Sequence, residues 1–236
     1  MSFPQLVIFD LDGTLIDSVP DLALAIDRTL SELGLPTAGE SLVREWVGNG
    51  AAKLVERALR FAMPLETMSL EASSSEASEL NVEAMHAKAL GIFFEQYHDC
   101  NAQRTVLYPG TLDALLELKT RNITMAIVTN KPKEFVPPIL SALNIAHYFD
   151  FVLGGDELDN KKPHPQPLLY CMSELGFEAS QTLMVGDSRN DIESARAADV
   201  LVAAVNYGYN HGRPIEDENP DYVLSDLREL TALKNN

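Results

Sequence analysis

Three short apolar runs, each ending in polar residues, restrict the folds open to this chain of 236 residues. They cover residues 6–9, 123–129 and 182–185, and their ends carry Asp10 and Asp12, Thr129 and Asn130, and Asp187, respectively. An apolar run of this length, bounded by turn-forming residues, is typical of a buried strand. Because the carboxyl ends of parallel strands share one edge of a sheet, these polar side chains can converge there.

The helical pattern is uneven along the chain. The segment between residues 17 and 108 is nearly all helical in its periodicity, whereas the chain after Pro109 alternates helices with strands, as a βαβ series does. We therefore predict an α/β fold, a doubly wound Rossmann-like parallel sheet with an inserted α-helical cap. The predicted core covers residues 1–16 and 106–236, and the predicted cap covers residues 17–105 with hinges near its two ends.

Capping residues and periodicity also place individual helices. Helices are expected over residues 18–34, 41–47, a stretch after Gly50, and residues 82–100, 133–143 and 168–176. Ser18 is expected to cap the first of them, and Pro137 with Pro138 implies a late start or a kink in the helix over 133–143. Residues 64–81 are rich in Ser and Glu, and the part from 66 to 79 is expected to form a mobile connection in the cap.

The net charge excludes some classes of partner. The chain has 35 acidic and 18 basic side chains and a formal charge of −17, which disfavours nucleic acid and anionic membranes. An anionic substrate therefore needs local positive charge from a metal ion, a lysine or backbone N–H groups. Two cysteines without a Cys-x-x-Cys arrangement and the lack of a targeting or membrane-spanning pattern predict a cytoplasmic protein of unspecified oligomeric state.

Asp10 and Asp12 are the most informative pair of residues in the chain. Carboxylates this close together repel each other, so a cation or a shared proton is expected to offset their charge. The alternative is a strand that ends in an ordinary turn formed by Asp12 and Gly13. The later run that ends in Asp187 repeats the arrangement and favours a site over a turn.

Four motifs, in their order and spacing, resemble those of the haloacid-dehalogenase-type phosphohydrolase superfamily. They are Asp10-Leu-Asp-Gly-Thr-Leu, Thr129-Asn, Lys162-Pro and Gly186-Asp-Ser-Arg-Asn-Asp191. Further segments of core and cap look like those of the bacterial phosphoglycolate phosphatase family: Trp46-Val-Gly-Asn-Gly-Ala, Tyr108-Pro-Gly, Thr129-Asn-Lys-Pro, Lys161-Lys-Pro-His-Pro and Val205-Asn-Tyr-Gly-Tyr-Asn. The resemblance implies an Mg²⁺-dependent hydrolysis of 2-phosphoglycolate, a small anionic phosphomonoester, to glycolate and phosphate.

The same resemblance implies roles for individual residues. Asp10 would attack phosphorus and form an aspartyl-phosphate, and Asp12 would protonate the leaving oxygen and then activate water. Three further residues, Thr129, Asn130 through its backbone, and Lys162, would bind the phosphoryl group. The metal ligands would be Asp10, the backbone carbonyl of Asp12, and Asp187, with Asp191 orienting waters or Asp187.

Several neighbouring residues allow two interpretations. In the cap, Gly48, Gly50, Arg44 and Lys53 could receive a substrate carboxylate, or they could be a plain turn and two solvated charges. Trp46 fits the core of the cap better than a substrate platform. Ser188 is at least as well explained as a helix cap, and His164, between two prolines, fits positioning better than catalysis.

Other reactions stay open as alternatives. Phosphonoacetaldehyde hydrolases use a cap lysine, for which Lys53 is the candidate, and haloacid dehalogenases lack the second acid, so Asp12 argues against both. A sugar phosphomutase, or a phosphatase for another small phosphomonoester, would keep both acids. A non-catalytic phosphate-binding protein on the same fold is also conceivable, because a fold alone does not establish an activity.

Overall fold

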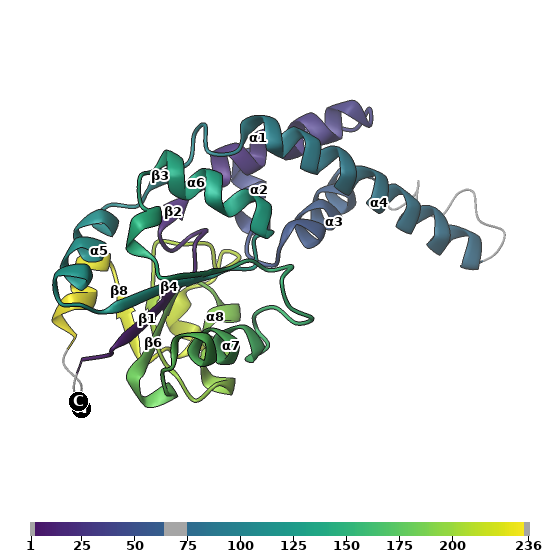
Figure 1. The fold of residues 1–236 in the computed structure, drawn as a ribbon. Helices are drawn as coiled ribbons and strands as arrows, with labels where there is room; N and C mark the ends of the chain where they lie inside the picture. The colour runs from purple at the N-terminus through teal and green to yellow at the C-terminus, as the bar shows by residue number, and fades with distance from the viewer. Residues whose placement is uncertain (1–2, 64–74, 234–236) are drawn as a thin grey trace.

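The computed structural model describes residues 3–63 and 75–233. Its centre is one sheet of parallel strands in the order β5-β4-β1-β6-β7-β8 (Figure 1). The strands are β1 (Leu6–Phe9), β4 (Thr124–Val128), β5 (Phe151–Leu153), β6 (Thr182–Gly186), β7 (Leu201–Val205) and β8 (Tyr222–Leu224). The predicted α/β class and parallel sheet are thereby confirmed.

Helices cover both faces of the sheet. Val7 and Phe9 of β1 pack on the side of α5 (Thr111–Thr120) and α6 (Val136–Ala142). Leu6 and Ile8 pack on the side of α7 (Gln166–Leu175) and α8 (Arg189–Ala197). A strand buried on both faces needs apolar residues at every position, which explains the continuous apolar runs in the sequence. Short 3₁₀ helices complete this part: η1 (Lys133–Phe135), η2 (Ala146–Tyr148), η3 (Ala179–Gln181), η4 (Ile215–Glu218) and η5 (Leu227–Ala232).

Four further helices lie beyond one edge of the sheet (Figure 1). They are α1 (Val19–Glu32), α2 (Glu40–Trp46), α3 (Ala51–Ala62) and α4 (Ser75–Cys100), and they share an apolar cluster of their own that includes Ile26, Leu54 and Phe93. The chain enters them through β2 (Ile16–Asp17) and leaves them through β3 (Val106–Leu107), and these two strands pair in antiparallel fashion. The entry and exit segments of the helical part are therefore joined side by side.

A buried carboxylate holds the two connections together. Asp21 of α1, with no exposed surface, accepts hydrogen bonds from the backbone N–H groups of Arg104 (2.9 Å) and Thr105 (2.9 Å) and from the Thr105 hydroxyl (2.7 Å). A buried carboxylate without such partners would be strongly unfavourable. Its bonds therefore fix the start of α1 against the segment that follows α4.

Two details differ from the expectations, and a third decides between two expected alternatives. Ser18 does stand before α1, but its hydroxyl donates to Asp12 instead of capping the helix. The helix expected from residue 82 begins earlier, at Ser75, so the expected mobile connection is wrong from there on, and residues 64–74 lie outside the described residues. The two prolines give a late start: Pro137 and Pro138 lie in the first turn of α6, where a missing N–H is tolerated.

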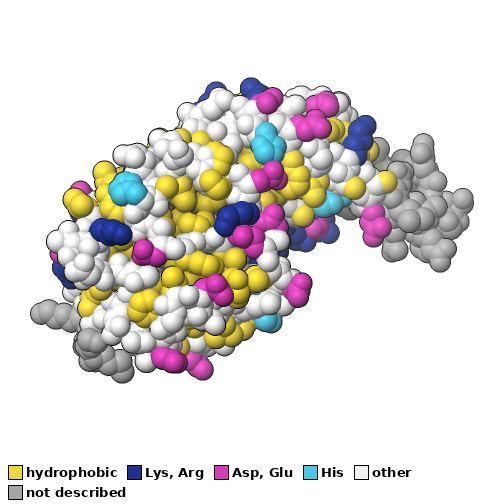
Figure 2. Space-filling model, viewed as in Figure 1, with side chains coloured by type: hydrophobic (Ala, Val, Ile, Leu, Met, Phe, Trp, Pro, Cys, Tyr) yellow, Lys and Arg dark blue, Asp and Glu magenta, His cyan; other side chains and the backbone are white. Residues whose placement is uncertain are grey.

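Charge is spread thinly over the surface. Figure 2 shows acidic side chains scattered over both the helical part and the sheet part, with fewer Lys and Arg among them. None of the helices in the described part of the chain combines the length and apolar character needed to cross a membrane.

Candidate active site

The three strand ends singled out in the sequence meet at one edge of the sheet. Strand β1 lies between β4 and β6 and is parallel to both. Asp10 follows β1, Thr129 follows β4, and Asp187 follows β6. The register pairs Phe9 with Val185 and with Ile127, so Asp10, Thr129 and Asp187 lie within one residue of the same height in the sheet. The convergence expected from parallel topology is observed.

Three buried carboxylates form a cluster at this edge of the sheet. One carboxylate oxygen each of Asp10, Asp187 and Asp191 lies within 4.8 Å of the others. Burial raises the pKa of Asp10 to about 6, although Lys162 acts in the opposite direction. Burial, followed by the charges of Asp191 and Asp10, raises the pKa of Asp187 well above its ordinary value. A positive charge among these oxygens would offset the repulsion between the carboxylates, which adds to the effect of burial on both pKa values.

Lys162 partly supplies that charge. Its side chain is almost fully buried, and its Nζ lies 2.9 Å from Asp10 Oδ1 and 2.7 Å from Asp191 Oδ1. It also donates to the carbonyl of Val128 over 2.6 Å. An ammonium group has three N–H donors, and these three contacts occupy them. The lysine expected from the sequence beside Asp10 is therefore in place and saturated.

The other two acids are held by hydrogen bonds. Asp191, in the first turn of α8, accepts at Oδ2 from the Ser188 hydroxyl (2.7 Å) and from the Ser188 N–H (3.1 Å). Ser188 thus takes part in a capping box. Asp187 accepts at Oδ1 from the Thr14 hydroxyl (2.9 Å) and at Oδ2 from the Tyr209 N–H (2.6 Å). Each bond fixes the orientation of a carboxylate.

The arrangement fits a divalent cation. Asp10 Oδ1 is buried and, apart from the ion contact with Lys162, has no hydrogen-bond partner. The oxygens of Asp187 each keep a lone pair, because a carboxylate oxygen can accept twice. Hard cations prefer such oxygen donors. In Asp191, by contrast, Oδ1 faces Lys162 and Oδ2 takes the bonds from Ser188, which suits a residue that orients the others.

Asp12 is paired with Lys131, a lysine to which no motif in the sequence had assigned a role. Lys131 Nζ lies 3.1 Å from Asp12 Oδ1 and 3.3 Å from Asp12 Oδ2, and its side chain is 3% exposed. The Ser18 hydroxyl donates to the same carboxylate. Burial alone would lower the pKa of Lys131, but the neighbouring Asp12 raises it above the ordinary value. The second acid is thus turned away from the carboxylate cluster by two donors.

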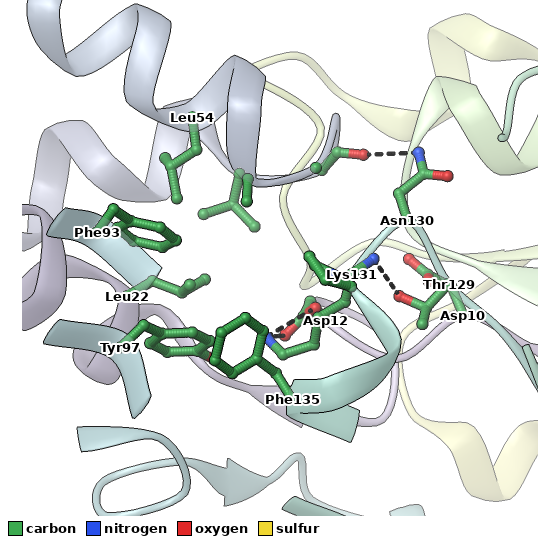
Figure 3. A pocket seen from close by; sticks show the side chains of 15 residues that line it. Asp10, Asp12, Leu22, Leu54, Phe93, Tyr97, Thr129, Asn130, Lys131 and Phe135 are labelled. Atoms are coloured by element: carbon green, nitrogen blue, oxygen red, sulfur yellow. Dashed lines mark hydrogen bonds and ion pairs between the residues drawn. The ribbon is translucent and has the colours of Figure 1, made fainter. Parts of the chain in front are cut away.

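Both acids line one pocket, with an empty volume of about 490 Å³ that is partly open to solvent. Figure 3 shows its two halves. Polar residues from the strand ends form one half: Asp10, Asp12, Thr129, Asn130 and Lys131. Apolar side chains from the helical part and η1 form the other: Leu22, Val47, Leu54, Phe93, Tyr97 and Phe135. A small polar molecule entering it is enclosed between the sheet edge and the helices.

Asn130 connects the two halves. Its amide Nδ2 donates to the carbonyls of Gly48 (3.1 Å) and Lys162 (2.9 Å). Asn190 of α8 donates to the same Gly48 carbonyl over 3.1 Å. The loop before α3 is thereby held against the sheet edge by two amides. The sequence marked Asn130 only for its backbone, and no local signal distinguished Asn190.

The cap candidates do not all reach the pocket. Gly48 and Gly50 line it, but Arg44 is bonded to Asp17 (3.0 Å) and to Glu40. Lys53 pairs with Glu56 on the surface, and neither cation is among the lining residues. Trp46 packs against the apolar cluster of the helices. As for His164, it is exposed, and its Nδ1 accepts the Gln166 N–H at the start of α7.

The loop after β7 supplies a further support. Tyr209 donates through its N–H to Asp187 and through its hydroxyl to Asp17 (2.5 Å). Gly208 is required beside it, because a Cβ there would lie 2.3 Å from the Asp187 Cβ. The segment had been noted only for its resemblance. Its contacts depend on tertiary structure and could not be found by spacing.

Comparison with known proteins agrees with this geometry. The family model of the haloacid dehalogenase-like hydrolases matches residues 7–205. This chain belongs to that family of hydrolases. The phosphoglycolate phosphatase of Pseudomonas syringae pathovar tomato is 47% identical over 227 residues, which are 96% of this chain and 78% of the relative.

Two further comparisons cover nearly the whole of both chains. The phosphoglycolate phosphatase of Nitrosococcus oceani is 42% identical over 230 residues, 98% of this chain and 96% of the relative. A crystal structure from Haemophilus somnus, described as a predicted phosphoglycolate phosphatase, superposes with a TM-score of 0.87 at 37% identity and covers 98% of each chain. The resemblance stated from the motifs is confirmed.

Proposed function

We propose that this enzyme hydrolyses 2-phosphoglycolate to glycolate and phosphate through an aspartyl-phosphate on Asp10. The names of its relatives support the substrate. The single observation that carries the mechanism is the pocket in which Asp10 and Asp12 stand side by side in different surroundings. Asp10 lies with Lys162 and the acid cluster, whereas Asp12 lies with Lys131 and Ser18.

The two acids would act in sequence. A carboxylate oxygen of Asp10 bonds to phosphorus while the ester oxygen departs, and Asp12 gives that oxygen a proton. Asp12 then takes a proton from water, whose oxygen bonds to phosphorus and releases Asp10 with phosphate. Thr129, the backbone of Asn130, and Lys162 would stabilise the charge on the phosphoryl oxygens.

The cation would be Mg²⁺, held by Asp10, the backbone carbonyl of Asp12, and Asp187. When bound, it neutralises negative charge on the phosphoryl group and the carboxylates. Asp191 would act as a positioning residue through Ser188 and Lys162. The buried, mutually repelling oxygens of Asp10 and Asp187 support this assignment.

We further propose that residues 1–16 and 106–236 form the core domain and residues 17–105 a cap that closes over the phosphate site. The apolar cluster of the helices, to which Phe135 and Tyr209 of the proposed core also contribute, supports this division, as does the paired ribbon of β2 and β3 at the junction. Residues of both parts line the pocket. The helical part would then contribute to substrate choice, because its apolar side chains form the wall of the pocket that faces the strand ends. The cytoplasmic location stays a prediction.

The test is phosphate release from 2-phosphoglycolate with Mg²⁺, measured for the parent and for Asp10→Asn. Loss of the nucleophile should lower kcat by at least about 10³-fold, since covalent catalysis is then unavailable. Asp113→Asn, on the exposed face of α5, is the matched control and should keep full activity. Full turnover by Asp10→Asn would refute the covalent mechanism. A clear kcat/KM advantage for an unrelated sugar phosphate would refute 2-phosphoglycolate as the preferred substrate but would not contradict phosphatase activity.

A further inference from the structure

One cation faces the substrate pocket, and it is the lysine that the motifs did not select. Of the described residues that line the pocket, Lys131 is the only one with positive charge. Its side chain is 3% exposed, so it is part of the interior of the site and not of the solvated surface. A buried ammonium in a catalytic pocket calls for an anionic partner.

Asp12 does not use the full capacity of this ammonium. An ammonium group has three donors, and within the described part of the chain the acceptors of Lys131 Nζ are the two oxygens of Asp12. On another side Nζ lies 4.8 Å from the centre of the Tyr97 ring, which forms part of the apolar wall. Lys131 therefore retains capacity for a second anion in the pocket.

Lys162 has no such capacity. Its three contacts are with Asp10, Asp191 and the carbonyl of Val128, so it serves the phosphoryl end of the site. The cap cations are committed elsewhere, Arg44 to Asp17 and Lys53 to Glu56. Lys161 Nζ lies near the pocket-lining Gly50, but Lys161 is exposed and is not itself a lining residue, so Lys131 is the lining cation that a second negative group can contact.

The position of Lys131 suits a group close to the scissile bond. Asp12, as proton donor, must contact the ester oxygen of the substrate, and Lys131 Nζ lies 3.1 Å from Asp12 Oδ1. In a 2-phosphorylated carboxylic acid, the carboxyl carbon is two bonds from that oxygen. Helix α3 begins directly after the pocket-lining Gly50, on the wall opposite Lys131. Its first backbone N–H groups have no side-chain cap.

We propose that Lys131 is the specificity residue that binds the carboxylate of the substrate, and the proposal rests on the phosphatase function proposed above. The apolar side chains Leu22, Leu54 and Phe93 around it exclude water and strengthen this ion contact. These three side chains give no hydrogen-bond partner to a neutral polar group. Lys131 therefore selects phosphomonoesters that carry a carboxylate next to the ester carbon.

The experiment compares two substrates of equal size, 2-phosphoglycolate and its neutral amide, 2-phosphoglycolamide. We measure kcat/KM for both with the parent, Lys131→Met and Lys131→Arg. Loss of the charge-assisted contact should reduce the preference for the acid by about 10- to 100-fold in Lys131→Met, mainly through KM. Lys131→Arg keeps the charge and should retain most of the preference. Lys53→Met, which removes a surface cap lysine, is the control and should leave the ratio unchanged.

The ratio separates substrate recognition from effects on Asp12. If Lys131 only positions Asp12, its removal slows both substrates equally, the ratio stays constant and the proposal is refuted. A parent enzyme without preference for the acid over the amide refutes it as well, and this arm requires no variant to fold. Failure of the phosphatase function gives a different result, because the parent then releases phosphate from neither compound.

Discussion

Neutralising Asp10 should stabilise the metal-free protein even as it abolishes catalysis. In the cluster with Asp187 and Asp191, burial raises the pKa of Asp10 from 3.8 to about 6. The folded state therefore holds a proton on Asp10 more tightly than the unfolded state. The ionised form destabilises the fold, and the variant Asp10→Asn, which cannot ionise, avoids this penalty.

The size of the effect follows from the pKa difference. A shift from 3.8 to about 6 corresponds to about 3 kcal/mol. The penalty is absent below pH 3.8, grows between pH 3.8 and about 6, and is complete above that. At pH 8, Asp10→Asn should therefore gain up to about 3 kcal/mol, or roughly 5–10 °C in Tm for a chain of this length. At pH 5 the gain should be about half as large.

The assay is thermal unfolding followed by circular dichroism in EDTA at pH 5 and pH 8, with Asp113→Asn as the exposed control. Added Mg²⁺ should raise the Tm of the parent more than that of Asp10→Asn, because the variant has lost an ionised ligand. A variant that is no more stable than the parent at pH 8, or equally stabilised at both pH values, would show that the buried charge does not carry the predicted penalty.

Three further perturbations address other parts of the molecule. EDTA should abolish phosphate release and Mg²⁺ restore it, whereas Asp187→Asn should need at least about tenfold more Mg²⁺ for half-maximal activity; an unchanged requirement would exclude Asp187 as a ligand. Asp21→Ala should lower the free energy of unfolding, measured in urea, by roughly 3–5 kcal/mol, because buried N–H groups lose their acceptor. The exposed control Glu174→Ala should change it by less than about 0.5 kcal/mol. Asn190→Ala removes one of two bonds to the Gly48 carbonyl and should raise KM about fivefold; an unaltered KM would mean that this contact does not support the closed pocket.

The strand ends could be predicted because two local rules combine. Runs of apolar residues identify buried strands, and parallel pairing brings their carboxyl ends together. Asp10, Thr129 and Asp187 therefore came together as expected. Their order along the chain and the lysine at position 162 then led to the family, and the family model agrees. The catalytic roles inferred from that resemblance remain predictions.

The second half of the site could not be predicted because its contacts depend on tertiary structure. Lys131, between an asparagine and a proline, gives no local sign of burial, and its partner Asp12 lies 119 positions away. The Ser18 hydroxyl was expected to accept a helix-capping hydrogen bond, but it donates to Asp12 instead. Arg44 is close in sequence to the pocket-lining residues Val47 and Gly48, but its guanidinium pairs with Asp17. In each case a contact formed in the folded structure, and not the local helix pattern, decided the orientation.

Tyr209 connects two parts of the molecule that differ in their proposed tasks. Its N–H holds Asp187, and its hydroxyl holds Asp17, where the chain enters the helical part. Arg44 of α2 pairs with the same Asp17 and lies over the tyrosine ring. A cation bound to Asp187 and a substrate that displaces α2 would therefore both affect Tyr209, the first through its N–H and the second through its ring and hydroxyl. Any thermodynamic linkage through it is reciprocal, so a substrate that tightens cation binding is itself bound more tightly by the same factor once the cation is present.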